Sequence, residues 1–171
     1  LLESEVRKNL GGDAEILSYQ NPDILAKARE AGYVTTEAAA LLAELFVQAM
    51  KDGADAILNV CSSVGEAADS MQDFARYAGV PIVRIDEEMC RDAVRRGRRI
   101  GLMATLPTTL EPTKNTVKRV SRELGRHVEI VDCLVEGAFG LDQEKFKELM
   151  VSYAGKIAED VDVILLCQGS M

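Results

Sequence analysis

The chain is organised around Asp55-Ala-Ile-Leu-Asn-Val-Cys-Ser-Ser63, an apolar run that ends in a cysteine and two hydroxyl side chains. A second stretch, Asp162-Val-Ile-Leu-Leu-Cys-Gln-Gly-Ser170, has the same plan of an Asp, an apolar run, a cysteine and small polar residues. Nearly every position of residues 54–60 is apolar, as in parallel strands that are buried on both faces. We therefore expect two equivalent strands, each of which delivers one cysteine, Cys61 or Cys167, to a loop.

Strands and helices are predicted to alternate along the whole chain. Apolar runs indicate strands at residues 14–19, 54–60, 80–85, 100–104, 128–134 and 161–166. Apolar residues at helical spacing indicate helices between them, one of them over residues 67–78, and residues 105–109 are expected to form a hydroxyl-rich loop. This alternation is typical of an α/β fold, in which right-handed crossovers build a parallel sheet with helices on both faces.

The order of the predicted elements also repeats. Helix, strand, long helix, strand and cysteine loop describe residues 1–63 and again residues 112–170. We expect two pseudo-symmetric lobes, residues 1–97 and 98–171, each a parallel sheet flanked by helices, with the site in the cleft between them. The strand at residues 100–104 has no counterpart in the first copy, and the elements after Cys61 have none after Cys167. The repeat therefore predicts that a leading strand and a trailing C-terminal part lie outside these 171 residues.

The composition excludes several classes of protein. With 28 acidic and 20 basic side chains the net charge is -8, which repels a phosphate backbone. Trp is absent and aromatic residues make up 5% of the chain, which argues against a base-stacking platform. There is no apolar run of about 20 residues and no signal-peptide pattern. We expect a cytoplasmic protein that binds neither nucleic acid nor membrane, in which the four cysteines are free thiols.

The loop after the first cysteine strand has the features of a binding site. Open α/β sheets bind ligands where a strand leads into a helix, because the helix start offers free backbone N–H groups. This position is expected to lower the pKa of Cys61 from about 8.5 towards neutrality, so that its thiolate can act as a base or nucleophile. Ser62 and Ser63 add donors suited to a carboxylate. A single cysteine at a strand end can equally be a small hydrophobic residue, but two at equivalent points of a repeat favour function.

The other two cysteines and the histidine are not expected to take part in the site. Cys90 lies on an apolar helix stripe and Cys133 within a strand, so both are expected in the core. The only histidine, His127, is expected to face solvent, and it leaves no convincing metal cluster. The motifs Gly-x-Gly-x-x-Gly and Gly-x-x-x-x-Gly-Lys are both absent. The sequence therefore predicts neither a cofactor nor a metal.

Three phrases in this order resemble the cofactor-independent aspartate/glutamate/hydantoin racemase superfamily. They are Gly53-Ala-Asp-Ala-Ile-Leu-Asn-Val-Cys-Ser-Ser63, Ile100-Gly-Leu-Met-Ala-Thr-Leu-Pro-Thr-Thr109 and Val161-Asp-Val-Ile-Leu-Leu-Cys-Gln-Gly-Ser-Met171. The resemblance covers nearly the whole chain. It implies two similar α/β lobes that each contribute one catalytic cysteine to the cleft between them.

The resemblance also implies roles for individual residues. Cys61 and Cys167 correspond to the catalytic pair. The residues at matching positions that are expected to contact polar groups of the substrate are Ser62, Ser63, Thr105, Thr108, Thr109, Gln168 and Ser170. Members that act on amino acids often have Asn-Thr after the first cysteine and Thr after the second, whereas Ser-Ser and Gln-Gly-Ser follow here. The loops are therefore more similar to the hydantoin racemase branch than to glutamate racemases.

The expected reaction is inversion of a carbon next to a carbonyl or carboxylate in an amino acid or hydantoin. Such an inversion requires one group to remove a proton from one face and a second group to return a proton to the other. A thiolate and a thiol on facing lobes can do both without a cofactor. The expected partner is a small molecule with carboxylate or amide groups, and the sequence leaves open whether the chain forms a homo-oligomer.

Three other functions remain open, in decreasing order of preference. The same scaffold supports maleate-type cis-trans isomerisation, in which one cysteine attacks an alkene. A non-catalytic α/β module could use both cysteines to line a ligand pocket. A thiol redox protein ranks last, because the chain contains no Cys-x-x-Cys. Arylmalonate decarboxylation is disfavoured, because it needs one cysteine and this chain has two at equivalent positions.

Overall fold

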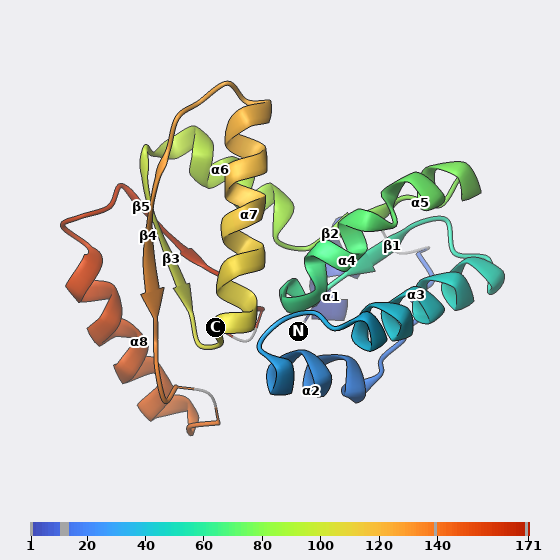
Figure 1. The fold of residues 1–171 in the computed structure, drawn as a ribbon, viewed down its shortest axis with the longest axis horizontal. Coiled ribbons are helices and arrows are strands. Elements are labelled where there is room, and N and C mark those ends of the chain that lie inside the picture. The colour runs from blue at the N-terminus through green and yellow to red at the C-terminus, as the bar shows by residue number, and fades with distance from the viewer. Residues whose placement is uncertain (1, 11–13, 139, 170) are drawn as a thin grey trace.

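The computed structural model describes residues 2–10, 14–138, 140–169 and 171, which form an α/β fold with two parallel sheets (Figure 1). The α/β class predicted from the sequence is confirmed. The helices are α1 (Leu2–Leu10), α2 (Pro22–Ala31), α3 (Thr36–Lys51), α4 (Gly65–Ser70), α5 (Gln72–Ala78), α6 (Glu87–Arg96), α7 (Pro107–Glu123) and α8 (Gln143–Ile157), with a short 3-10 helix, η1 (Ser62–Val64). The strands are β1 (Ile57–Asn59), β2 (Ile82–Arg84), β3 (Arg99–Ala104), β4 (Glu129–Leu134) and β5 (Val163–Leu166).

The first sheet consists of β1 and β2, paired in parallel with Asn59 opposite Arg84. Its inward residues pack against α3 and α4 in a core that includes Phe46, Val64 and Ile82. The other face is open, since Leu58 is 40% exposed and Val83, its partner across the two strands, is 50% exposed. The prediction that the first cysteine strand is buried on both faces is therefore wrong, because no described helix covers this face.

The second sheet has the order β4-β3-β5, with all strands parallel and β3 in the centre. One face packs against α6 and α7 in a core that includes Val94, Leu102, Val117 and Leu165. On the other face, Met103 and other buried residues pack against apolar side chains of α8. This sheet has the covering by helices on both faces that the sequence predicts for parallel strands.

Three local predictions are corrected by the structure. Residues 14–19 form no strand, and this segment is held by side chains, including the Tyr19 hydroxyl, which donates to Asp52 Oδ2 at 2.7 Å. The helix expected over residues 67–78 is interrupted at Met71, between α4 and α5. Thr108 and Thr109 belong to α7 and not to the preceding loop, because Pro107, whose missing N–H is tolerated there, starts the helix.

The two sheets are connected through α6 and α7. The chain leaves β2 and enters α6, whose Cys90, Ala93 and Val94 pack in the core of the second sheet. Two side-chain hydrogen bonds join α7 to the region that follows β1: Ser63 to Thr109, and Asn115 Nδ2 to Glu66 Oε1 at 2.7 Å. The division into lobes at residues 97 and 98 stays a prediction.

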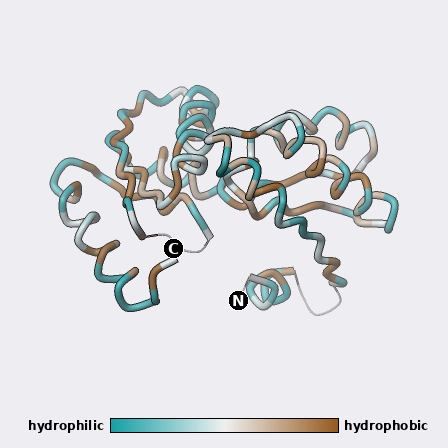
Figure 2. The backbone as a smooth tube through the Cα atoms, turned by 60° about the horizontal axis from the view of Figure 1, so that its bottom comes forward, coloured by the Kyte–Doolittle hydropathy of each residue, from teal (hydrophilic) through white to brown (hydrophobic). Residues whose placement is uncertain are grey.

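The first helix lies apart from the rest of the chain (Figure 2). The described side chains of α1 are almost all exposed, including that of Leu10. Among the helices that the structure describes, none combines the length and the apolar character needed to cross a membrane.

Candidate functional site

Cys61 lies where the sequence places it, directly after β1 and before η1. Its side chain is partly buried, and burial raises the pKa of the thiol. The backbone N–H groups of Val64 and Ser63 and the Ser63 hydroxyl act in the opposite direction, as expected for a thiol at a helix start. The prediction of a lowered pKa for Cys61 is nevertheless wrong, because loss of hydration outweighs these donors.

Cys167 lies directly after β5, at the carboxyl end of the second sheet. It is 1% exposed, its backbone N–H donates to Met103 O at 2.9 Å, and its Sγ lies 3.8 Å from Leu165 O. Burial raises the pKa of the Cys167 thiol to about 12, while the Thr113 hydroxyl favours the thiolate and acts in the opposite direction. Cys167 is therefore a neutral thiol at physiological pH, suited to donating a proton.

The start of α7 is next to both cysteine loops. Ser63, two residues after Cys61, has its Oγ 2.9 Å from Thr109 Oγ1, and both side chains are buried. Thr113 follows Thr109 by one helical turn and therefore lies on the same side of α7, where it interacts with Cys167. Its Oγ1 donates to Thr109 O at 2.9 Å, and because the hydroxyl has one hydrogen, it must turn from Thr109 O to stabilise a Cys167 thiolate. The first turns of α7 thus form a wall shared by the Cys61 loop and Cys167.

Thr113 is the functional candidate that the sequence reasoning missed. A usable signal was present: hydroxyl residues recur at positions 109, 113 and 116, which is helical spacing, on a helix whose later positions 117 and 120 are apolar. All three threonines are buried. A buried stripe of hydroxyls on a helix face indicates a polar site more strongly than any single threonine does.

The loops after β3 and β5 are held together by a second pair of predicted site residues. Both the backbone N–H and the Oγ1 of Thr105 donate to Gln168 Oε1, at 2.6 Å and 2.9 Å. These bonds use the carbonyl oxygen of Gln168. Among the contacts that the structure describes, its Nε2 has no acceptor, so two N–H donors remain for a ligand.

Thr108 carries an unpaired polar atom. The side chain is 6% exposed, and within the described residues its Oγ1 has no hydrogen-bond partner. An unsatisfied buried hydroxyl costs about 1–3 kcal/mol, so such an atom marks a place where a ligand can supply the missing bond. Leu106, which precedes α7, offers no side-chain cap, so the helix start also lacks this partner for its free N–H groups.

The other predicted residues are placed as follows. Ser62 is buried at the start of η1, beside Cys61. Ser170 lies outside the described residues. Cys90 and Cys133 are buried in the core, as predicted. In the described part of the chain, no group of His, Cys, Asp or Glu side chains has the arrangement of a metal site.

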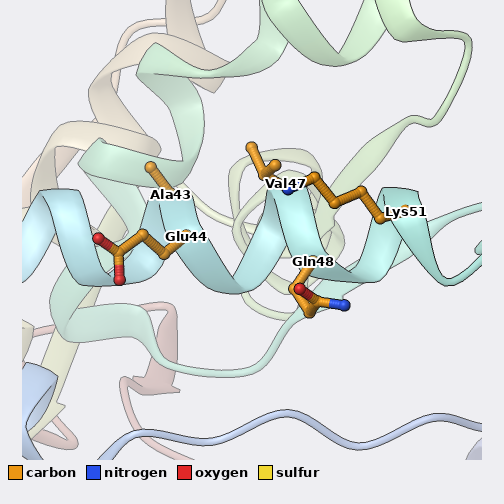
Figure 3. A pocket seen from close by; sticks show the side chains of 5 residues that line it. All are labelled: Ala43, Glu44, Val47, Gln48 and Lys51. Carbon is orange, nitrogen blue, oxygen red and sulfur yellow. The ribbon is translucent and has the colours of Figure 1, made fainter.

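A surface hollow elsewhere on the molecule has no relation to these residues. Figure 3 shows its lining side chains, which all project from α3: Ala43, Glu44, Val47, Gln48 and Lys51. A ligand site brings convergent polar groups from several elements together in a concave surface. The side of a single helix does not meet this description, so we assign the hollow no role.

One of three comparisons with known proteins gives a match. A family model described as Asp/Glu/Hydantoin racemase matches residues 1–171. Searches of curated proteins and of solved structures returned no match. Because the family model spans every residue, including both cysteine loops and α7, the chain belongs to the Asp/Glu/hydantoin racemase family.

Proposed function

We propose that the protein is a cofactor-independent racemase that inverts a carbon next to a carbonyl or carboxylate in an amino acid or hydantoin. Membership of the family supports a racemase or isomerase function. The observation that carries the finer proposal is that the Cys61 loop and Cys167 both border the first turns of α7. Two thiols that flank one wall can act on opposite faces of a bound carbon acid, as a two-base inversion requires.

The two cysteines begin the reaction in different states. Cys61 is only partly buried and has the N–H groups of Val64 and Ser63 beside its sulfur, so it is the thiol that ionises more readily. Cys167, with a pKa of about 12, holds its proton. We infer that the active form of the enzyme pairs a Cys61 thiolate with a Cys167 thiol, and that this form is a minority at neutral pH because burial raises the pKa of Cys61. Cys61 removes the proton from one enantiomer, Cys167 protonates the opposite face, and the reverse direction exchanges these roles.

The polar groups near the cysteines support the proposed substrate class. The unpaired Thr108 hydroxyl, the Nε2 of Gln168 and the buried Ser62 hydroxyl can all donate hydrogen bonds. Donors of this kind stabilise the negative charge that develops on a carbonyl or carboxylate oxygen when the adjacent carbon loses its proton. A small molecule with carboxylate or amide oxygens is therefore the proposed substrate.

Exchange in heavy water tests the two-base mechanism. Each pure enantiomer of a panel of amino acids and 5-substituted hydantoins is incubated with wild-type protein, Cys61→Ser or Cys167→Ser and followed by proton NMR. Serine is far too weak an acid to replace the thiol, so each variant should lose inversion by at least about 100-fold. The surviving cysteine should still exchange the proton of the one enantiomer that faces it, with retention of configuration, and exchange should be slower in Cys61→Ser because Cys167, with a pKa of about 12, is rarely ionised.

The expected signature is therefore opposite enantiomer preference in the two variants. Cys133→Ala, which removes a core thiol away from this reaction, should racemise like the wild type. A blank without protein corrects for spontaneous exchange of hydantoins. If Cys61→Ser or Cys167→Ser racemises at the wild-type rate, or if both exchange the same enantiomer, the two-base assignment is wrong.

A further inference from the structure

A buried arginine with two carboxylate partners lies at the end of β2. Arg84 donates from Nε and Nη2 to the two carboxylate oxygens of Asp86, at 2.9 Å and 2.8 Å, and from Nη1 to Asp69 Oδ2 at 2.6 Å. The side chains of Arg84 and Asp86 are 1% and 3% exposed. Burying such charges carries a large desolvation penalty, so a buried ion pair is weak evidence for a purely stabilising role.

The guanidinium group of Arg84 packs directly against the helix that follows the Cys61 loop. A Cβ added to Gly65, the first residue of α4, would overlap the Nη2, Cζ and Nε atoms of Arg84. Asp69, the third member of the cluster, lies near the other end of the same helix. Arg84 therefore contacts α4 at both ends, and α4 begins immediately after η1.

The backbone around Arg84 contacts β1, the strand that precedes the Cys61 loop. Arg84 is paired in register with Asn59, and the N–H of Ile85 donates to Asn59 O at 3.0 Å. The side chain of Asn59 in turn donates from Nδ2 to Cys61 O at 3.2 Å. Cys61 thus lies between two segments, β1 and α4, that both contact Arg84.

The second partner of Arg84 leads to the other cysteine. Asp86 precedes α6, and it makes no side-chain cap because its carboxylate is taken up by Arg84. Cys90, one turn into α6, is buried in the same core cluster as Cys167. The Arg84–Asp86 pair therefore links the Cys61 loop to the helix that packs with Cys167.

We infer that Arg84 is a positioning residue, whose bonds to Asp86 and to Asp69 of α4 together fix the Cys61 loop relative to Cys167. The guanidinium group is suited to this task, because its planar fork matches a carboxylate and a lysine ammonium does not. The catalytic consequence rests on the proposed racemase function, whereas the effect on the Cys61 loop does not.

The charges of Arg84 and Asp86 also affect the pKa values of nearby thiols. After burial, the Asp86 carboxylate is among the groups that raise the pKa of Cys61, Cys90 and Cys167, and Arg84 lowers the pKa of Cys90. Arg84→Lys keeps the positive charge and removes the planar fork that reaches both carboxylates and packs against Gly65. This variant therefore separates the positioning role from a general electrostatic one.

The first measurement is the rate at which iodoacetamide alkylates Cys61 in the full chain, located by peptide mass spectrometry. Arg84→Lys is expected to loosen the loop and to accelerate this alkylation by about threefold or more. The matched control is Arg91→Lys, which makes the same substitution on α6 at an arginine that pairs with Glu87, Glu88 and Glu123. The control should alkylate Cys61 at the wild-type rate.

The second measurement is steady-state racemisation of whichever substrate the exchange experiment identifies. Arg84→Lys should lower kcat by about tenfold or more and change KM less than about twofold, because the proposed substrate contacts at Thr108 and Gln168 lie outside the cluster. Arg91→Lys should change neither constant. If no substrate is racemised even by the wild type, the proposed function fails, while the alkylation rates still decide whether Arg84 positions the loop.

Two results would overturn the inference: wild-type alkylation of Cys61 in folded Arg84→Lys, or equal acceleration by Arg91→Lys. If Arg84→Lys does not fold, Asp69→Asn replaces it, since Asp69 is partly exposed and the bond between Arg84 and Asp86 remains. Asp69→Asn should accelerate alkylation by a smaller factor, about 1.5-fold or more. An unchanged rate in this folded variant contradicts the proposal.

Discussion

Replacing Ser63 by Ala is expected to destabilise the protein, because the Thr109 hydroxyl then lies buried without its partner. The two oxygens are 2.9 Å apart, and both residues are at most 3% exposed, so water does not compensate for the loss. A buried hydroxyl left unsatisfied costs about 1–3 kcal/mol. Ser63→Ala should therefore lower the free energy of unfolding by about 1–3 kcal/mol.

Removing the other hydroxyl of the pair should lower the free energy of unfolding by a smaller amount. Thr109→Val keeps the β-branched shape and removes only the hydroxyl, which leaves the Ser63 hydroxyl unpaired. Ser63 also lies beside the Cys61 sulfur, a weak acceptor, so part of its hydrogen bonding survives. The double variant leaves neither hydroxyl unpaired. The decrease in its free energy of unfolding should be about 1–3 kcal/mol smaller than the sum of the decreases in the two single variants.

Urea denaturation followed by circular dichroism measures all four proteins of this cycle. Thr116→Val is the control, because its Oγ1 is also buried on α7 but donates to Pro112 O of the same helix, at 3.0 Å. Ser63→Ala combined with Thr116→Val should be additive within about 0.5 kcal/mol. If the effects of Ser63→Ala and Thr109→Val on the free energy of unfolding are equally additive, the hydrogen bond between the two residues contributes nothing to stability. In that case it does not hold α7 to the Cys61 loop.

Two further predictions concern the second sheet. Gly101→Ala should lower the free energy of unfolding by less than about 1 kcal/mol in the same urea assay, because the atom nearest the added Cβ, at 2.8 Å, is Cδ1 at the movable end of the Ile157 side chain; a loss of about 3 kcal/mol or more would show that Ile157 of α8 cannot move away from β3. The Asp162 carboxylate accepts the backbone N–H groups of Arg99 and Arg98, which hold its pKa below the ordinary 3.8. The contribution of Asp162 to stability is thus present above pH 3.8 and is lost as the pH falls through the lower folded-state pKa. The melting temperature should therefore fall less between about pH 6 and pH 3 in Asp162→Asn than in the wild type. An equal fall in the two proteins would refute this.

The sequence located the elements that carry the site, because their signals are local. The apolar runs before Cys61 and Cys167 correspond to β1 and β5, and both cysteines follow their strands directly. Residues 14–19 have a similar apolar character but form no strand. A strand exists only when a neighbouring strand accepts its hydrogen bonds, and a local pattern does not contain that partner.

Other features depend on packing that a linear pattern does not encode. The exposure of Leu58 and Val83 follows from which helices cover the first sheet, and the interaction of Thr113 with Cys167 follows from how α7 packs on the second sheet. The pKa of Cys61 is a balance between backbone donors and burial. The sequence predicted the donors correctly, but the degree of burial that outweighs them is a property of the folded chain.

The hydrogen bond between Ser63 and Thr109 limits the number of hydrogen bonds that these two predicted substrate contacts can donate to a substrate. Each hydroxyl has one hydrogen, and in a bonded pair one of the two hydrogens is used between the partners. The oxygen that accepts this bond keeps its own hydrogen. If Ser63 is the acceptor, its hydrogen can be donated to the Cys61 sulfur or to a substrate oxygen, but not to both, and the pair does not have to separate. The same pair can therefore hold α7 against the Cys61 loop and contribute one donor to the site. A substrate that needed donors from both hydroxyls would have to break this bond, at a cost of about 0.5–1.5 kcal/mol, which favours substrates that take only one.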